Sequence, residues 1–277
     1  MKRHHHDLTV TPVHFLNVLL ILFIGLHLTG CTCLPERNAA TPERTTLQDG
    51  TIRELLASRN PGMILMAEAQ VTIDGPRGKY TRTVALAAGE PSSLRIESMP
   101  LFGLPDFFLA SKDGVMRIFL PGQGKFYIVA AERTSLSRFL DINLSVEDTI
   151  RLMTGSAPAF PEGTRYEGYC EGDICRIEAY SGMTRVAVVA VRTGGREIET
   201  IEVFTGEGAP WYSAAFDEYQ REGDLSCPRH ISLRIEEPEK TSIEIRYRNF
   251  EFTPGGDAAS LFELAVPPGV TVESPAD

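Results

Sequence analysis

Histidine and the carboxylates are the residues that could support acid–base chemistry or bind a metal, and their placement argues against both. Five of the six histidines of this 277-residue chain lie within the first thirty residues, so His230 is the one imidazole of the remainder. His230 begins a segment of alternating polar and apolar residues, which is more typical of a surface histidine on a strand than of half a catalytic pair. The carboxylates lack the spacing of an acid–base pair or a calcium loop, and no H-E-x-x-H, G-x-S-x-G or G-x-x-x-x-G-K-S/T motif occurs. The sequence therefore predicts a protein that is not an enzyme and has no catalytic residue, metal or cofactor.

The first of the five cysteines, Cys31, ends an apolar leader. Lys2 and Arg3 precede an apolar run over residues 15–28, which suits a signal peptide and is too short to span a bilayer. The run ends in Leu-Thr-Gly-Cys, which resembles the bacterial lipobox, in which small residues precede a cysteine that is diacylated and becomes the mature N-terminus. The alternative is an ordinary secretory leader that ends near an unrelated cysteine.

We therefore expect a signal peptide over residues 1–30, a lipidated Cys31 with a flexible polar tether over residues 31–48, and a single domain over residues 49–277. Acyl chains contribute about 0.8 kcal/mol per buried methylene, so this anchor would hold the protein on a membrane. Under the sorting rule of Gram-negative lipoproteins, Asp after the lipidated cysteine favours the inner membrane. This chain has Thr32 there, which favours the outer membrane, facing the periplasm.

Two further cysteines suit an oxidising compartment. Cys170 and Cys175 flank a turn-like tetrapeptide between two strand-like segments, which brings them within disulfide range. A zinc site is the alternative, but no histidine accompanies the pair. For Cys33 and Cys227 the sequence leaves a mutual bridge and two free thiols equally open.

The composition narrows the function further. The chain is 43% hydrophobic, which excludes a disordered protein, and its net charge of −10 argues against binding nucleic acid or an anionic bilayer by charge.

Period-two hydrophobicity dominates the part after the tether. A helix over residues 46–59 precedes alternating segments such as residues 65–73, which Asp-Gly and other turn dipeptides separate. Residues 134–154 predict two short helices, the second starting at a capping box of Ser145 and Asp148. We count about eleven to thirteen antiparallel strands, the last a brief one over residues 261–265. A single meander of this length must curl to hide its apolar face. The helices in its middle either complete an ordinary core or form a lid over a lipid-sized cavity.

Two segments strengthen this interpretation. The chain resembles the LolA/LolB-like lipoprotein-localisation superfamily in the order of its elements and in two segments. These are LRIESMPLFG over residues 94–103 and the closing FELAVPPGV over residues 262–270. The resemblance covers most of residues 47–272. It implies a mainly β fold with a few helices (α+β), in which a long antiparallel meander curls into an incomplete β-barrel with a helical lid. It also implies that the apolar interior accepts the acyl chains of another lipoprotein, with a periplasmic LolA-type carrier as a possible partner.

The resemblance gives the loop over residues 99–105 a role. In the acceptor branch of the superfamily, an apolar residue exposed in a Pro-Leu-Gly turn helps to deliver cargo into the bilayer. The matching residues here are Pro100 and Leu101, with Phe102 inserted before the glycine. Two prolines and a glycine exclude a regular strand, while four large apolar side chains favour burial. The loop therefore either tucks into the core or protrudes to contact lipid.

Candidate cavity residues are alternating apolar positions of the meander and apolar positions of the two middle helices. They are Leu94, Ile96, Met116, Ile118, Leu140, Ile150, Met153, Leu233 and Ile245. Each could equally be a plain core residue. Our first hypothesis is an outer-membrane-anchored lipoprotein that binds acyl chains of lipoproteins, or other lipids, without a cofactor. The second is a structural or sensory lipoprotein that binds a protein partner without transporting lipid.

Overall fold

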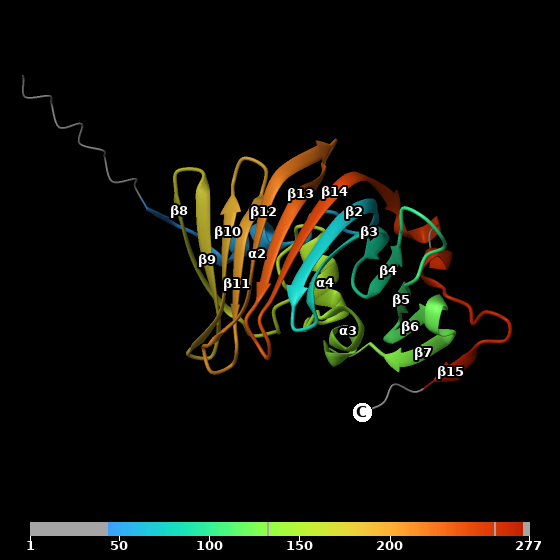
Figure 1. The fold of residues 1–277 in the computed structure, drawn as a ribbon. Coiled ribbons are helices and arrows are strands. Elements are labelled where there is room, and N and C mark those ends of the chain that lie inside the picture. Colours follow the sequence, from blue (N-terminus) through green and yellow to red (C-terminus); the bar gives the residue numbers. More distant parts are fainter. Residues whose placement is uncertain (1–43, 132, 258, 274–277) are drawn as a thin grey trace, which may run out of the picture. The chain divides into compact units, whose positions relative to one another are not determined.

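The alternating segments form one curved sheet in the computed structural model, which describes residues 44–131, 133–257 and 259–273 (Figure 1). The strands are β1 (Thr45–Thr46), β2 (Met63–Gly75), β3 (Gly78–Gly89), β4 (Ser93–Ser98), β5 (Phe108–Lys112), β6 (Val115–Leu120), β7 (Lys125–Ala130), β8 (Arg165–Glu171), β9 (Ile174–Ser181), β10 (Thr184–Arg192), β11 (Glu197–Phe204), β12 (Pro210–Glu222), β13 (Leu225–Ile235), β14 (Thr241–Pro254) and β15 (Thr271–Glu273). The helices are α2 (Asp49–Leu56), α3 (Arg133–Leu140) and α4 (Val146–Met153), with 3-10 turns η1 (Pro121–Gln123), η2 (Gly255–Asp257) and η3 (Ala259–Phe262).

The sheet is open. Its order is β1-β8-β9-β10-β11-β12-β13-β14-β2-β3-β4-β5-β6-β7-β15, and every described pair is antiparallel except β7 with β15. Since β14 pairs with β2 along most of its length, the two halves of the meander join in the middle of the sheet. The predicted mainly β fold, an incomplete barrel with a few helices, is confirmed.

Three details differ from the prediction. The predicted strand over residues 261–265 is wrong, because η3 and irregular chain occupy this segment. The last strand, β15, instead lies closer to the C-terminus of the chain. The two-residue strand β1 pairs with β8, so residues 45 and 46, which were assigned to the tether, are part of the sheet. The first helix is also shorter than the expected 46–59. Strands of two or three residues contain too few positions for an alternating pattern to reveal them.

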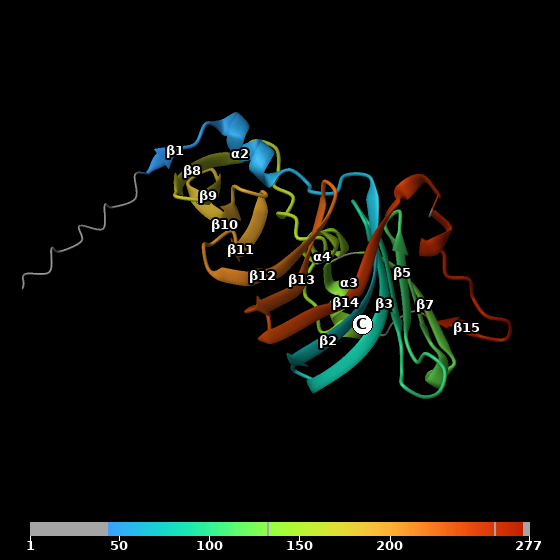
Figure 2. The same ribbon diagram turned by 90° about the horizontal axis from the view of Figure 1, so that it is seen from above.

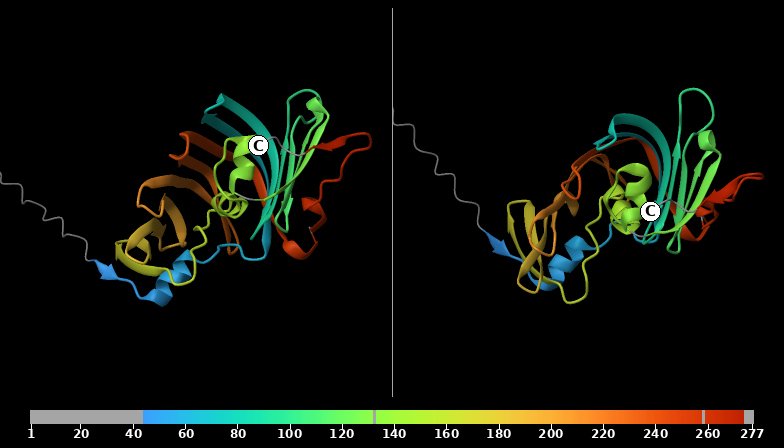
Figure 3. Two further views of the ribbon diagram at one scale, coloured as in Figure 1. Left: turned by 90° about the horizontal axis from the view of Figure 1, so that it is seen from below. Right: turned by 60° about the horizontal axis from the view of Figure 1, so that its bottom comes forward.

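The two middle helices lie on the concave side of the sheet. Figure 3 shows α3 and α4 within the curve formed by β12–β14, β2 and the strands from β3 to β7. Helix α4 begins as predicted, because the Ser145 hydroxyl accepts a hydrogen bond of 2.9 Å from the backbone N–H of Asp148. Its apolar face, with Ile150 and Met153, is buried against the sheet.

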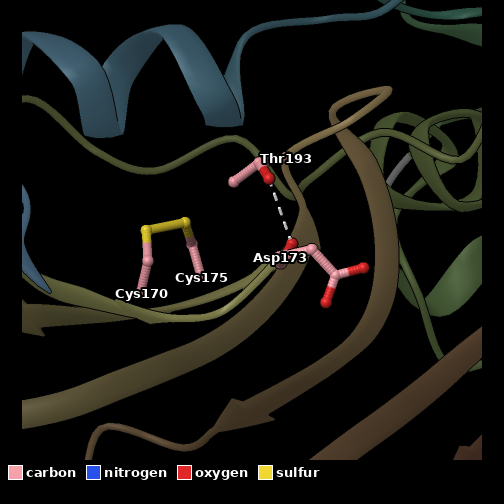
Figure 4. Close-up of a disulfide and its surroundings, with 4 residues drawn as sticks. All are labelled: Cys170, Asp173, Cys175 and Thr193. Carbon is pink, nitrogen blue, oxygen red and sulfur yellow. Dashed lines mark hydrogen bonds between the residues drawn. A yellow bond between two sulfur atoms is a disulfide. The ribbon is translucent and has the colours of Figure 1, made fainter. Parts of the chain in front are cut away.

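The predicted disulfide is present. Cys170 and Cys175 lie directly opposite each other at the end of the β8–β9 hairpin and are joined. Figure 4 shows this bond next to the β10–β11 turn, where the Thr193 hydroxyl and backbone N–H both donate to the carbonyl of Asp173. The disulfide therefore closes the hairpin at the point where the neighbouring turn is attached.

Candidate functional site

A cavity of about 460 Å³ lies between the concave face of the sheet and the middle helices. Strands β14, β2, β3 and β4 form its wall, and α3, the α3–α4 connection and the end of α4 cover it. The lining residues are Val71, Ile73, Arg77, Tyr80, Arg82, Val84, Leu86, Ile96, Ser98, Asp106, Phe107, Phe139, Leu140, Ile142, Met153, Ile243 and Ile245.

The lining changes from polar to apolar along β3. Tyr80 and Arg82 stand near the start of the strand, and the next two residues on the same face are Val84 and Leu86. Twelve of the seventeen lining residues are apolar, and the charged ones gather at this end. The cavity therefore has a polar rim and an apolar interior, which is the arrangement that an amphiphile requires.

An ion pair joins the rim to the lid. Arg77, in the β2–β3 turn, donates from Nε to Oδ1 of Asp141 at 2.6 Å and from Nη2 to the carbonyl of Ser137 at 3.1 Å. Burial, together with the nearby Asp141 carboxylate, raises the pKa of the Tyr80 phenol, which keeps that phenol neutral. These contacts attach α3 and the residue after it to the mouth of the cavity.

The opposite side of the rim is built on Ser98. Its hydroxyl donates to Asp106 Oδ1 at 2.5 Å and accepts from the backbone N–H groups of Asp106 and Phe107. Arg82 Nη2 lies 3.7 Å from Asp106 Oδ2, and both side chains are more than half exposed. The two ends of the loop over residues 99–105 are thereby fixed at the rim.

The loop itself protrudes. Leu101, Phe102 and Leu104 are 91%, 93% and 87% exposed, and Met99 is 43% exposed. Pro100 is exposed as well, and Gly103 adopts a φ of +91°, in the left-handed region that favours glycine. Of the two alternatives for this loop, the structure has the exposed one. Whether Pro100, Leu101 and Phe102 contact a membrane stays a prediction.

The loop leaves the sheet at the same end as several hairpin tips. Because neighbouring strands from β9 to β7 are antiparallel, the connections after β9, β11, β13, β2 and β4 all emerge at one end. Figure 2 shows the β13–β14 and β2–β3 tips projecting to the same side. The cavity rim, which includes Arg77 from the β2–β3 turn, therefore lies at this end.

The nine candidate cavity residues divide into two groups. Ile96, Leu140, Met153 and Ile245 line the cavity. The remaining five, which are Leu94, Met116, Ile118, Ile150 and Leu233, are buried in the core cluster and do not line it. Most of the wall formed by β2 and β3, such as Val71 and Leu86, was not among the nine candidates, although both strands show the period-two pattern.

His230 lies on the other face of the sheet from the core residues Ile231 and Leu233. Its Nε2 is 2.6 Å from Oε2 of Glu244, the carboxylate oxygen to which Ser232 donates at 2.8 Å, and its Nδ1 is 3.7 Å from Oδ2 of Asp217. Ser232 Oγ also lies 3.5 Å from Nε2 of His230, so the imidazole and the hydroxyl both contact the Glu244 carboxylate in a small polar cluster outside the core. Among the described residues, no group of three or more His, Cys, Asp or Glu could hold a metal ion.

Among the described residues, one further cysteine remains, and it does not line the cavity. Cys227 is a free, fully buried thiol whose pKa is raised by burial, so it is unreactive. Cys31 and Cys33 lie outside the described residues. No described helix is long and apolar enough to cross a membrane.

The curved open sheet and its helices enclose a concave apolar site of the kind that small apolar ligands occupy. No family model and no curated protein matches the sequence. Solved structures with a similar fold include a putative outer membrane lipoprotein-sorting protein domain from Vibrio parahaemolyticus, with 15% identity and a TM-score of 0.52 over 76% of this chain and 94% of that chain. A LolA superfamily protein from Nitrosomonas europaea has 11% identity and a TM-score of 0.53 over 79% of this chain and 98% of that chain. A DUF1329 family protein from Desulfovibrio piger has 13% identity and a TM-score of 0.52 over 77% of this chain and 95% of that chain. The chain therefore has the LolA-like fold.

Proposed function

We propose that the protein is an outer-membrane-anchored lipoprotein that binds the acyl chains of lipoproteins, or other lipids, and assists lipoprotein localisation. The observation that carries this proposal is the 460 Å³ apolar cavity with an exposed apolar loop at its rim. The solved structures with the same fold include one described as a lipoprotein-sorting domain, which agrees with such a role. A periplasmic LolA-type carrier would be one partner for this role.

Binding and release would need no cofactor or nucleotide. An acyl chain that enters the cavity gains about 0.8 kcal/mol for each buried methylene. A bilayer offers the same chain a similar apolar environment, so transfer is driven by the difference between the two affinities. Insertion of Leu101, Phe102 and Leu104 into the bilayer would contribute roughly 1.5–3 kcal/mol per side chain and would bring the rim to the membrane surface.

The anchor is a separate part of the proposal. Cys31 follows the lipobox-like sequence and would carry the acyl chains, while the residues after it would serve as the tether. Mass spectrometry of the N-terminal peptide from membranes tests this directly. A mature chain that begins elsewhere, or an unmodified Cys31, would remove the anchor but leave the cavity argument in place.

Delivery is tested with Leu101→Glu. The substitution places a charge on a side chain that is 91% exposed, so we expect an unchanged melting temperature and a loss of transfer of a fluorescent lipopeptide from the protein to liposomes. The control is Val266→Glu, which changes an exposed apolar residue next to Ala265, beside the β5–β6 turn at the opposite end of the sheet. Unchanged delivery by Leu101→Glu, or an equal loss in both variants, would contradict a membrane-contact role for the loop.

A structural or sensory role through a protein partner is the second candidate. The observation that favours it is a set of apolar side chains that are each 40–45% exposed: Ile128 on β7, Val272 on the neighbouring β15, and Val266 in the segment between η3 and β15. This role requires no acyl chain in the cavity. Native mass spectrometry of the protein purified from cells separates the two candidates, because only the first predicts co-purified acyl species.

A further inference from the structure

We propose that the cavity takes a single acyl chain, and that its ligand is a single-chain amphiphile whose anionic head group binds Arg82 at the rim. The shared chemistry of such ligands is one hydrocarbon tail with a carboxylate or phosphate, as in a fatty acid or a lysophospholipid. This inference rests on the proposed lipid-binding function and specifies its ligand.

The size of the cavity sets the number of chains. A methylene group occupies about the same volume as a water molecule in the liquid, roughly 30 Å³. A cavity of about 460 Å³ therefore holds about fifteen methylenes, which is one chain of ordinary length. The several chains of a fully acylated lipoprotein would need a multiple of this volume.

The packing beyond the cavity prevents a longer or second chain from entering. Leu86 and Ile96 pair across β3 and β4 at the inner end of the lining. The next pair on the same face is Ala88 with Leu94, and both are completely buried in the core cluster. Since this part of the concave face is filled, the cavity ends there, and a chain that extends further must displace core residues.

Of the two arginines that line the cavity, Arg82 is the more loosely paired and can rearrange to meet a head group. Arg77 is committed to Asp141 and the Ser137 carbonyl through short hydrogen bonds. Arg82 forms a looser ion pair, with its Nη2 3.7 Å from Oδ2 of Asp106, which is beyond hydrogen-bond distance, while Ser98 donates to the other oxygen, Oδ1. A guanidinium matches a carboxylate or phosphate in a bidentate arrangement. Arg82 also lies two residues from Val84 on the same face of β3, so a head group there leaves its tail directed along the apolar lining.

A chain-length series tests the size of the cavity. Saturated fatty acids of eight to twenty carbons are titrated against the purified full chain by displacement of a fluorescent fatty acid, and the bound species are counted by native mass spectrometry. We expect one ligand per protein, with affinity rising about fourfold per methylene up to roughly fifteen carbons and then levelling off. An affinity that keeps rising to twenty carbons, or two bound chains, would overturn the single-chain assignment.

The head group is tested with Arg82→Glu and a matched control, Arg234→Glu, an exposed arginine at a position on β13 that does not line the cavity. Arg82→Glu should lower the affinity for palmitate and for palmitoyl-lysophosphatidylglycerol by roughly tenfold, which is the effect of losing a hydrogen bond to a charged group. Uncharged hexadecanol should bind equally to all three proteins, which also shows that Arg82→Glu is folded. An unchanged palmitate affinity in Arg82→Glu overturns the head-group assignment.

The outcomes separate this inference from the proposed function. A triacylated lipopeptide that binds more tightly than palmitate, with all its chains protected from a lipase, sinks the single-chain proposal and leaves lipoprotein binding intact. No binding of any acylated probe to the folded chain removes both. Preference for palmitate over the lysophospholipid, or the reverse, identifies the source of the head group.

Discussion

The position of the cavity predicts that a phenylalanine introduced at two positions of β3 has very different effects on the free energy of unfolding. Val84 and Ala88 point to the same face, four residues apart, but Val84 lines the cavity whereas Ala88 is buried between Leu65 and Leu94. Val84→Phe adds four carbons in a compact ring, which take up less than the roughly 120 Å³ of four methylenes, and the cavity of about 460 Å³ accommodates them. Ala88→Phe adds six carbons where no space exists.

We therefore expect the free energy of unfolding to change by less than about 1 kcal/mol in Val84→Phe and to fall by about 3 kcal/mol or more in Ala88→Phe. Val84→Phe should also shorten the preferred acyl chain by on the order of two to four methylenes, because the ring fills part of the cavity.

Urea unfolding followed by circular dichroism, with linear extrapolation, measures the first effect, and the m-value should stay constant. The fatty-acid series measures the second. A destabilisation of Val84→Phe as large as that of Ala88→Phe would show that the space beside Val84 is packed, and the reasoning from the cavity would fail.

Three further predictions concern the cysteines, the last of them together with Tyr247. Replacing Cys170 and Cys175 together by Ser should lower the free energy of unfolding by about 2 kcal/mol, since the disulfide closes only a short loop, and an unchanged urea midpoint would contradict this. Cys227 should resist iodoacetamide at pH 8 until urea unfolds the protein, as read by peptide mass spectrometry. Burial raises the pKa of this thiol and of the Tyr247 phenol, so as the pH rises the unfolded state loses these protons before the folded state does. The free energy of unfolding should therefore fall as the pH rises above roughly 8.5. A free energy of unfolding that stays constant through pH 10 would refute this prediction.

Local chemistry was the most predictable part of this fold. The hairpin around Cys170 and Cys175, the Ser145 cap and the two middle helices each depend on a few adjacent residues, and all are present. The pairing of β14 with β2 depends on contacts between residues about 180 positions apart, to which local patterns do not respond. The closing segment over residues 261–265 was misread as a strand because its composition is apolar.

The division between cavity and core could not be predicted. Leu94 and Ile96 lie on the same face of β4, and both fit the alternating pattern equally well. One is sealed in the core and the other lines the cavity, because they stand at different distances from the open end of the sheet. Period-two hydrophobicity reports which face a side chain occupies, whereas the position of the cavity along the strand is set by where α3 and α4 lie.

The exposed loop has a cost that the fold alone does not repay. Keeping Leu101, Phe102 and Leu104 in water forgoes roughly 1.5–3 kcal/mol of burial per side chain, which is large against a typical domain stability of about 5–15 kcal/mol. The base of the loop is nonetheless fixed, since the backbone N–H of Met99 donates to the carbonyl of Thr83 and that of Ser98 donates to the carbonyl of Phe107. Because Ser98 at one end of the loop lines the cavity, a bilayer that covers the loop also covers the rim. Under the proposed function, an acyl chain would then pass from the cavity to the membrane without crossing water, and the apolar loop would lower the barrier to its release.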